Sequence, residues 1–278
     1  MRSRYIVKDL LATIGRLLEG SVPRSSREAQ LFLMEFLKVD ELWLITNRSL
    51  VIEEDFTLLF EWVKRRKADE PFEYIVKHVS FYSQDFYIDK GALIPRPETE
   101  LLIDEVCKNL PNGVDDDFLF AEVGVGSGIV SIVLAQKFPN AKFIATDISS
   151  EALRVAKINI DRFNLNDRIE LRCGSLLECV DEDIDYLVSN PPYIANGFKL
   201  EKNLSYEPQN ALFGGEVGDE IVKKLLDEVL QRGIKYFSCE MGYDQKVKIE
   251  QYLELFQYEK LEFYVDYSGF DRGFTLKL

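Results

Sequence analysis

The segment Asn190-Pro191-Pro192-Tyr193 could hold a planar nitrogen for chemistry, and it directly follows the apolar run Tyr186–Ser189. An amide or exocyclic amine has a delocalised lone pair, so it must be held through its N–H groups, and the Asn190 side-chain oxygen is an acceptor for them. The two prolines fix φ at about −65° and lack N–H donors, which leaves backbone carbonyls as further acceptors. The Tyr193 ring can lie against the planar group. We expect Asn190, Pro191 and Tyr193 to be catalytic and Pro192 to line the same site, although such a segment alone could be an ordinary proline turn.

A glycine-rich turn lies upstream of this segment. The apolar run Phe118–Val123 is followed by Gly124-Val125-Gly126-Ser127-Gly128 and then by an apolar helical pattern. Such a strand, turn and helix start bring the backbone close to a ligand at the carboxyl edge of a sheet. A dinucleotide-binding fingerprint would need glycine at position 129, where Ile129 stands. The observed spacing favours S-adenosylmethionine, which has an amino group and no pyrophosphate. Together the two motifs predict methyl transfer to a weakly nucleophilic nitrogen.

Further acidic and turn residues are candidates for the cofactor site. Asp147 ends an apolar run nineteen residues beyond Gly128 and could accept hydrogen bonds from both ribose hydroxyls, or could cap the next helix. Glu122 could bind the backbone amides of the turn or an ammonium group of the ligand. The Ser175-Leu176 turn could frame the adenine edge, or could be a plain surface turn.

Alternating strand and helix patterns follow residue 98. We expect strands at 118–123, 142–146, 168–172, 186–189, 236–239, 259–266 and 272–278, and helices at 98–109, 129–138, 150–163 and 219–232. This alternation predicts an α/β fold with a mostly parallel sheet covered on both faces, and a terminal hairpin at the sheet edge.

The chain also divides by pattern. Residues 1–70 have helical periodicity and predict a small all-α domain. Residues 81–89 alternate between apolar and polar, so residues 71–97 are predicted to form a β-hairpin linker, with prolines at its end. Residues 98–278 form the predicted Rossmann-like domain.

Composition excludes several classes of protein. The chain has 278 residues, of which 46% are hydrophobic, and a formal net charge of −14, which disfavours sequence-independent binding to a phosphate backbone. No apolar run reaches the ~18 residues of a membrane span, and the N-terminus lacks a secretory pattern, so we expect a cytoplasmic protein that does not bind membranes. The four cysteines are scattered and there is a single histidine, so no metal site is expected.

These residues resemble one family closely. The chain is similar to the bacterial protein-(glutamine-N5) methyltransferases of peptide-chain release factors, the HemK/PrmC family, over nearly its whole length. The narrowest signals are the segments 93–100 (LIPRPETE), 206–208 (YEP) and 211–215 (ALFGG). One departure is Lys77-His78, which stands where the family usually has glycine.

The resemblance implies a class I S-adenosylmethionine-dependent methyltransferase fold with a seven-stranded sheet. It also implies that the substrate is the glutamine of the Gly-Gly-Gln loop of class 1 release factors, docked with help from the helical domain. We expect the enzyme to be a monomer. Asn190 and Pro191 are implied to accept the two N–H bonds of the glutamine, and Asn190 to lie near the methionine part of the cofactor. Phe81 could form a wall beside the amide or pack in the core. The resemblance implies that Gly124, Gly126, Gly128, Asp147, Ser175, Leu176 and Asn190 bind the cofactor, and we expect Glu122, Val125 and Ser127 to belong to the same site.

Two other functions use some of the same residues. A nucleic-acid amino-methyltransferase acting on adenine N6 or guanine N2 would hold a flipped base with the same tetrapeptide. The net charge and the lack of a recognisable target-reading domain oppose it. A protein that binds S-adenosylmethionine without turnover would not need an amide clamp at Asn190.

Overall fold

The computed structural model describes residues 2–115 and 117–278. The chain separates into two compact units. The first contains the residues up to Lys77 together with Lys202–Tyr206, and the second contains His78–Glu201 and Glu207–Leu278. The division between the units therefore falls between Lys77 and His78, and the hairpin expected as a linker belongs to the second unit.

The first unit is built mainly from helices. Leu10, Ile14, Phe32 and Leu59 are fully buried in its core. Its helices are α1 (Val7–Leu18), α2 (Ser25–Leu37), α3 (Glu41–Thr46), α4 (Thr57–Lys67) and α5 (Phe72–Val76). An antiparallel ribbon of β1 (Ser3–Ile6) and β2 (Val51–Glu54) is also present, so the expectation of a purely helical domain was wrong in this detail.

Helix α5 ends in a conformation that residues with a side chain rarely adopt. Lys77 ends this helix in the left-handed region, with φ of 58° and ψ of 38°. A glycine adopts this conformation without the steric cost that a side chain carries, about 1 kcal/mol. Lys77 therefore adopts this conformation at a small cost.

The second unit contains a seven-stranded sheet in the order β12-β13-β11-β8-β5-β6-β7. Only β13 is antiparallel to its neighbours, so the remaining six strands run the same way. The mostly parallel sheet and the C-terminal hairpin at its edge are thus confirmed. The strands are β5 (Leu119–Val123), β6 (Lys142–Asp147), β7 (Ile169–Cys173), β8 (Tyr186–Ser189), β11 (Tyr236–Glu240), β12 (Lys260–Val265) and β13 (Asp271–Lys277).

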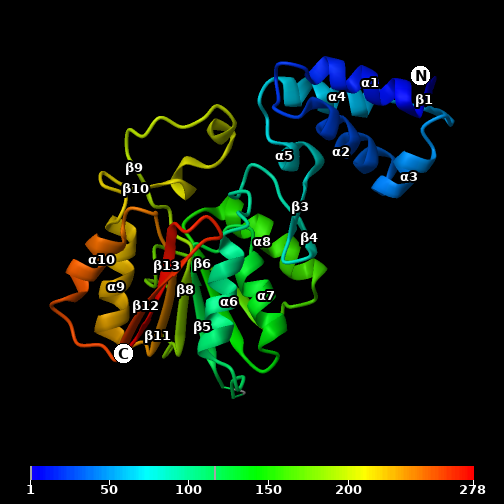
Figure 1. Ribbon diagram of the computed structural model, residues 1–278. Helices are drawn as coiled ribbons and strands as arrows, with labels where there is room; N and C mark the ends of the chain where they lie inside the picture. The colour runs from blue at the N-terminus through cyan, green and yellow to red at the C-terminus, as the bar shows by residue number, and fades with distance from the viewer. Residues whose placement is uncertain (1, 116) are drawn as a thin grey trace. The chain divides into compact units, whose positions relative to one another are not determined.

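Helices cover both faces of this sheet. Figure 1 shows α6 (Thr99–Asn109), α7 (Ile129–Lys137) and α8 (Ser150–Arg162) on one face. The other face is covered by α9 (Glu220–Arg232) and α10 (Lys246–Leu253). A continuous apolar core joins β8 and β11 to α9 and α10 through Leu187, Phe237, Leu226 and Ile249, all fully buried. Two short pairs complete the unit, β3 (His78–Phe81) with β4 (Gln84–Tyr87) and β9 (Ile194–Ala195) with β10 (Phe213–Gly215).

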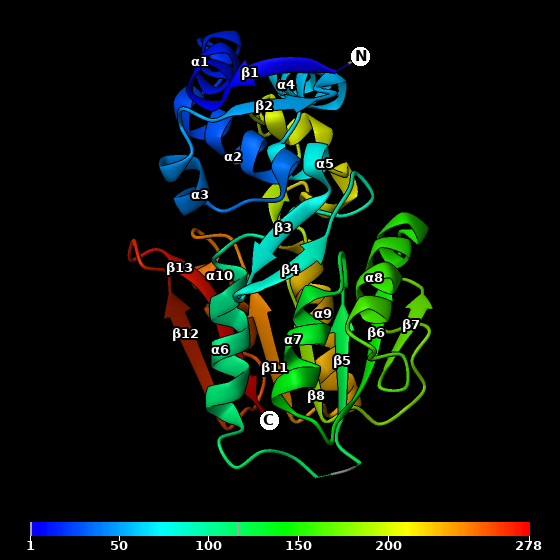
Figure 2. The ribbon, with the colours of Figure 1, turned by 90° about the vertical axis from the view of Figure 1, so that its right-hand side faces the viewer.

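The topology predicts where a ligand binds. The chain leaves β5 for β6 on one side, whereas β8 is added on the other side of β5. In open α/β sheets, such a reversal leaves a crevice outside the carboxyl ends of the strands, where ligands bind. Figure 2 shows the strands of this sheet side by side, with α6, α7 and α8 in front of them. Among the described residues, no helix is long and apolar enough to cross a membrane.

Candidate active site

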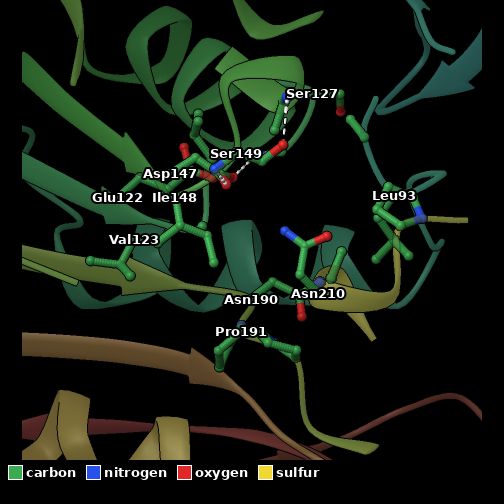
Figure 3. A pocket seen from close by; sticks show the side chains of 18 of the residues that line it. Leu93, Glu122, Val123, Ser127, Asp147, Ile148, Ser149, Asn190, Pro191 and Asn210 are labelled. Atoms are coloured by element: carbon green, nitrogen blue, oxygen red, sulfur yellow. Dashed lines mark hydrogen bonds between the residues drawn. The ribbon is translucent and has the colours of Figure 1, made fainter. Parts of the chain in front are cut away.

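A cavity of about 310 Å³ lies at the carboxyl edge of the sheet, within the second unit. This volume is at the lower end of the range for small-molecule sites, roughly 300–1,000 Å³. Figure 3 shows Glu122, Asp147, Asn190 and Pro191 around it. The residues expected from sequence that line it are Glu122, Gly124, Val125, Gly126, Ser127, Asp147, Ser175, Leu176, Asn190, Pro191 and Pro192.

The glycine turn has a backbone that requires glycine. Gly124, Gly126 and Gly128 have φ of 77°, 52° and 82°, in the region that residues with a side chain rarely adopt. The N–H groups of Gly124 and Val125 both donate to Thr146 O at 2.9 Å, which fastens the turn to β6. Gly128 does not line the cavity. A Cβ there would lie 3.3 Å from Ala156 Cα, so this glycine permits α7 to pack closely on α8.

Asp147 joins the turn to the end of β6. Its Oδ2 accepts a hydrogen bond from Gly126 N at 3.0 Å, and its Oδ1 accepts one from Ser149 N at 2.9 Å. Ser149, and not Asp147, caps α8, because its side chain accepts a hydrogen bond from Ala152 N. Burial raises the pKa of Asp147, and the hydrogen bonds from Ser149 and Gly126 oppose this effect. A carboxylate oxygen can accept two bonds, so acceptor positions remain for ligand hydroxyls.

Glu122 lies beneath the turn with 4% of its surface exposed. Its Oε2 accepts two hydrogen bonds from Ser131, which lies in the first turn of α7. One comes from the backbone N–H, at 2.9 Å, and the other from the hydroxyl. Burial raises the pKa of Glu122 to about 8; the Ser131 bonds lower it and the nearby Asp147 carboxylate raises it further. A cationic group in the cavity would favour its charged form.

The turn after β7 closes another wall. Gly174 N donates to Asp147 O at 3.1 Å, and Thr146 Oγ1 donates to Leu176 O at 2.9 Å. Leu176 itself has a positive φ of 51°. The backbone around Ser175 and Leu176 is therefore fixed against the end of β6, at the margin of the cavity.

The segment after β8, Asn190–Pro192, lies beside the glycine turn that follows β5. Ser189 Oγ donates to Val123 O at 2.8 Å and ties the ends of β8 and β5 together. Asn190 Nδ2 donates to Thr99 Oγ1 at 3.0 Å. The glycine turn and the Asn190–Pro192 segment thus line one cavity, as their chemistry requires.

Two expected substrate residues do not line the cavity. The Tyr193 hydroxyl donates to Glu240 Oε1 at 3.2 Å, and burial raises the pKa of this tyrosine. Phe81 is 3% exposed, and its ring packs against Phe86 with centroids 6.3 Å apart. The structure therefore favours the core-packing alternative for Phe81.

Sequence reasoning assigned no role to several residues at the cavity. Arg96 Nη2 donates to Glu207 Oε1 at 2.6 Å, and Glu207 Oε2 accepts from Ile94 N at 3.1 Å. This partly buried ion pair joins two of the segments that carried the narrowest family signals, 93–100 and 206–208. Arg96, Pro208 and Asn210 line the cavity beside it. The spacing of 111 residues between Arg96 and Glu207 gives no local signal of their contact.

The residues fit an S-adenosylmethionine site. The backbone of the glycine turn lines the cavity and leaves room for a ligand. Asp147 at the end of β6 suits the ribose, and Glu122 beneath the turn suits a cationic amino-acid part. Among the described residues there is no cluster of His, Cys, Asp and Glu that could hold a metal ion.

The fold and this cavity define the class of protein, an S-adenosylmethionine-dependent methyltransferase. Solved structures with the same fold include the hMettl16 catalytic domain in complex with a MAT2A 3'UTR hairpin, with a TM-score of 0.58 and 17% identity over 69% of this chain and 74% of that chain. The N-terminal domain of human METTL16 in complex with SAH has a TM-score of 0.51 and 18% identity over 69% of this chain and 75% of that one. At this identity the likeness shows the fold.

Sequence comparisons identify the family. Residues 82–208 match the methyltransferase small domain and residues 9–76 match the PrmC N-terminal domain. Two relatives are named release factor glutamine methyltransferase: one from Koribacter versatilis is 38% identical over 81% of each chain, and one from Clostridium botulinum is 34% identical over 96% of this chain and 97% of its own. The chain belongs to the release factor glutamine methyltransferase family.

Proposed function

We propose that this enzyme methylates the side-chain amide nitrogen, N5, of the glutamine in the Gly-Gly-Gln loop of class 1 peptide-chain release factors. The observation that carries the proposal is that Asn190 and Pro191 line the same cavity as the glycine turn and Asp147. The names of the relatives support the protein substrate. The enzyme acts as a monomer in the cytoplasm, without binding nucleic acid.

The glycine turn would hold the cofactor, and Asp147 would accept hydrogen bonds from its ribose hydroxyls. When bound, S-adenosylmethionine supplies an electrophilic methyl group. Glu122, Ser175 and Leu176 line the cavity. Glu122 would balance the cationic amino-acid part of the cofactor, and the Ser175-Leu176 turn would hold the adenine.

The substrate amide is held by acceptors that belong to this chain. Asn190 Oδ1 and the Pro191 carbonyl accept its two N–H bonds and fix the plane of the amide. Accepting these protons also increases the electron density on nitrogen as it leaves planarity. Positioning of this kind can lower a barrier by several kcal/mol, up to roughly 7–11 in the best intramolecular models. No strong base is needed, because the methylated nitrogen becomes acidic enough to lose a proton to water.

Labelled-methyl transfer tests this proposal. Purified class 1 release factor, the same protein with its Gly-Gly-Gln glutamine replaced by alanine, DNA and RNA are each offered to the enzyme. We expect label only in the unaltered release factor. With Asn190→Ala, turnover should fall by roughly 100-fold or more, since a preorganised hydrogen-bonding group in an active site contributes about that much, while the affinity for S-adenosylmethionine falls less. Label in nucleic acid alone, or undiminished turnover by the variant, would contradict the proposal.

A further inference from the structure

Three side chains from distant parts of the chain form a line of hydrogen bonds that ends at Asn190. Thr99 Oγ1 donates to Glu240 Oε2 at 2.8 Å, and Asn190 Nδ2 donates to Thr99 Oγ1 at 3.0 Å. Thr99 and Glu240 are 3% and 1% exposed. Neither belongs to the glycine turn or to the segment after β8, which the proposed function uses, but Thr99 also lines the cavity.

The sheet and one helix bring these residues together. Parallel strands β8 and β11 pair Ser189 with Cys239, so Asn190 and Glu240 lie next to each other at the same edge. Thr99 is the first residue of α6, which begins at this edge. Its hydroxyl does not cap α6, because the cap residue is Glu98 and no side-chain cap bond is present there. The Thr99 hydroxyl is therefore committed to Glu240 and Asn190.

The line has a fixed direction of donation. An ionised carboxylate only accepts, so Glu240 requires the single hydroxyl proton of Thr99. The Thr99 oxygen is then left as an acceptor for Asn190. An asparagine amide has two ends of nearly equal shape, one donor and one acceptor, and a neighbouring acceptor selects the NH₂ end. Asn190 therefore turns Nδ2 toward Thr99, and Oδ1 is the end left for the cavity that this residue lines.

We propose that Thr99 and Glu240 are positioning residues that orient the Asn190 amide so that its oxygen faces the substrate. The inference rests on the proposed function in one respect, namely that Asn190 Oδ1 accepts a substrate N–H bond. If the amide were reversed, its NH₂ group would oppose the substrate NH₂ group, and the clamp would be lost.

Glu240 is itself held firmly. Its other oxygen, Oε1, accepts the Tyr193 hydroxyl at 3.2 Å, so each carboxylate oxygen has a hydroxyl donor. Burial raises the pKa of Glu240 to about 7; the bonds from Thr99 and Tyr193 and the charge of Arg272 lower it, and Glu98 raises it. Experiments at pH 8 keep most of this carboxylate ionised and acceptor-only.

Two substitutions at Thr99 distinguish the contribution of its hydroxyl to kcat from the contribution of its packing. Thr99→Val keeps the shape and removes the hydroxyl, whereas Thr99→Ser keeps the hydroxyl. With release factor as substrate at pH 8, Thr99→Val should lower kcat roughly 10- to 100-fold, on the scale of losing one aligned group, and change the Kd of S-adenosylmethionine less than about threefold. Thr99→Ser should restore kcat to near the wild-type value. Glu240→Gln, which can donate to Thr99, should resemble Thr99→Val.

A double-mutant cycle distinguishes positioning from general support. If Thr99 acts through Asn190, then Thr99→Val should have no further effect on kcat in an Asn190→Ala background. An equal loss in both backgrounds, or equal activity of the Val and Ser variants, would overturn the inference. Thermal unfolding of each variant checks that the fold is retained.

A substrate-independent measurement keeps this inference distinct from the proposed function. In ¹H–¹⁵N NMR spectra, one Asn190 Nδ2 proton should be shifted and protected by its bond to Thr99, in wild type and Thr99→Ser but not in Thr99→Val. Failure of the wild-type enzyme to methylate release factor would overturn the proposed substrate while leaving this result intact. Identical Asn190 signals in all three proteins would overturn the inference alone.

Discussion

Asp147 Oδ2 accepts a hydrogen bond from the backbone N–H of Gly126 at 3.0 Å, which joins the end of β6 to the turn that follows β5. The same carboxylate accepts Ser149 N at the start of α8. One side chain thus fixes the glycine turn and the next helix start while bordering the cavity (Figure 3). Its loss should affect the cofactor in two ways, through direct contacts and through the turn.

The substitution Asp147→Ala should therefore weaken S-adenosylmethionine binding. Hydrogen bonds to a charged group contribute about 1.5–3 kcal/mol each, so the Kd should rise at least roughly tenfold. Isothermal titration calorimetry with S-adenosylmethionine measures this change. Asp161→Ala is a control, because Asp161 lies on the exposed side of α8 and pairs with Lys157. Unchanged affinity in Asp147→Ala would remove this residue from the cofactor site.

Local patterns were sufficient to predict most of the catalytic unit. Strands and helices expected from periodicity between residues 98 and 278 are present, with each end within one residue of the expected position. The cavity also brings together the glycine turn, Asp147 and Asn190, which separate motifs had indicated. These features are predictable because apolar periodicity and glycine turns depend on neighbours in sequence.

Features that depend on distant residues were not predicted. Thr99 and Asn190 are 91 positions apart, and Thr99 and Glu240 are 141 positions apart, so no window of sequence contains their contact. The same holds for β1 and β2, which pair across the first unit. Helix α10 was missed because its eight residues bury only Ile249 and Leu253, which is too few for a clear helical period.

The buried carboxyl of Glu122 leads to a prediction about pH. Since its pKa is raised to about 8, most of it is protonated at pH 7 in the cofactor-free protein. A cationic ligand favours the charged form, so binding should release up to one proton. The affinity of the wild type relative to that of Glu122→Gln should increase as pH rises toward 8 and then level off. Calorimetry at pH 7 in two buffers of different ionisation enthalpy measures the released proton.

The matched control is Glu122→Gln, which keeps the shape and cannot ionise. The amino group of the ligand titrates in the same range, at about 7.7–8.0 for an α-amino group, and contributes equally to both proteins. The difference between them therefore belongs to Glu122. Equal proton release by the wild type and the variant would mean that Glu122 does not meet the cationic part of the cofactor.

A substitution at Gly214 tests whether methyl transfer depends on the exact position of the Asn190–Pro192 segment. It lies in β10, and a Cβ at this position would be 2.3 Å from Pro192 O and 2.6 Å from Gly218 O, both backbone atoms. Its backbone is outside the positive-φ region, so the effect of Gly214→Ala is steric. The Pro192 carbonyl must move, and displacement of about 1 Å near a reacting group can cost roughly 100-fold in rate. We expect kcat for release factor to fall at least tenfold, on the same scale.

The cofactor site provides the comparison for Gly214→Ala, because the glycine turn follows β5 and Asp147 ends β6, and neither is among the nearest atoms that a Cβ at Gly214 would meet. The Kd of S-adenosylmethionine should therefore change less than about threefold, well below the loss in kcat. Gly15→Ala in α1 is the control for adding a methyl group: its Cβ would meet Ser26 Cα at an ordinary 3.8 Å. It should stabilise the helix by about 0.5–1 kcal/mol and leave kcat unchanged. A wild-type kcat in Gly214→Ala would show that methyl transfer tolerates movement of the Asn190–Pro192 segment. It would contradict the hypothesis that this segment must hold the substrate amide rigidly.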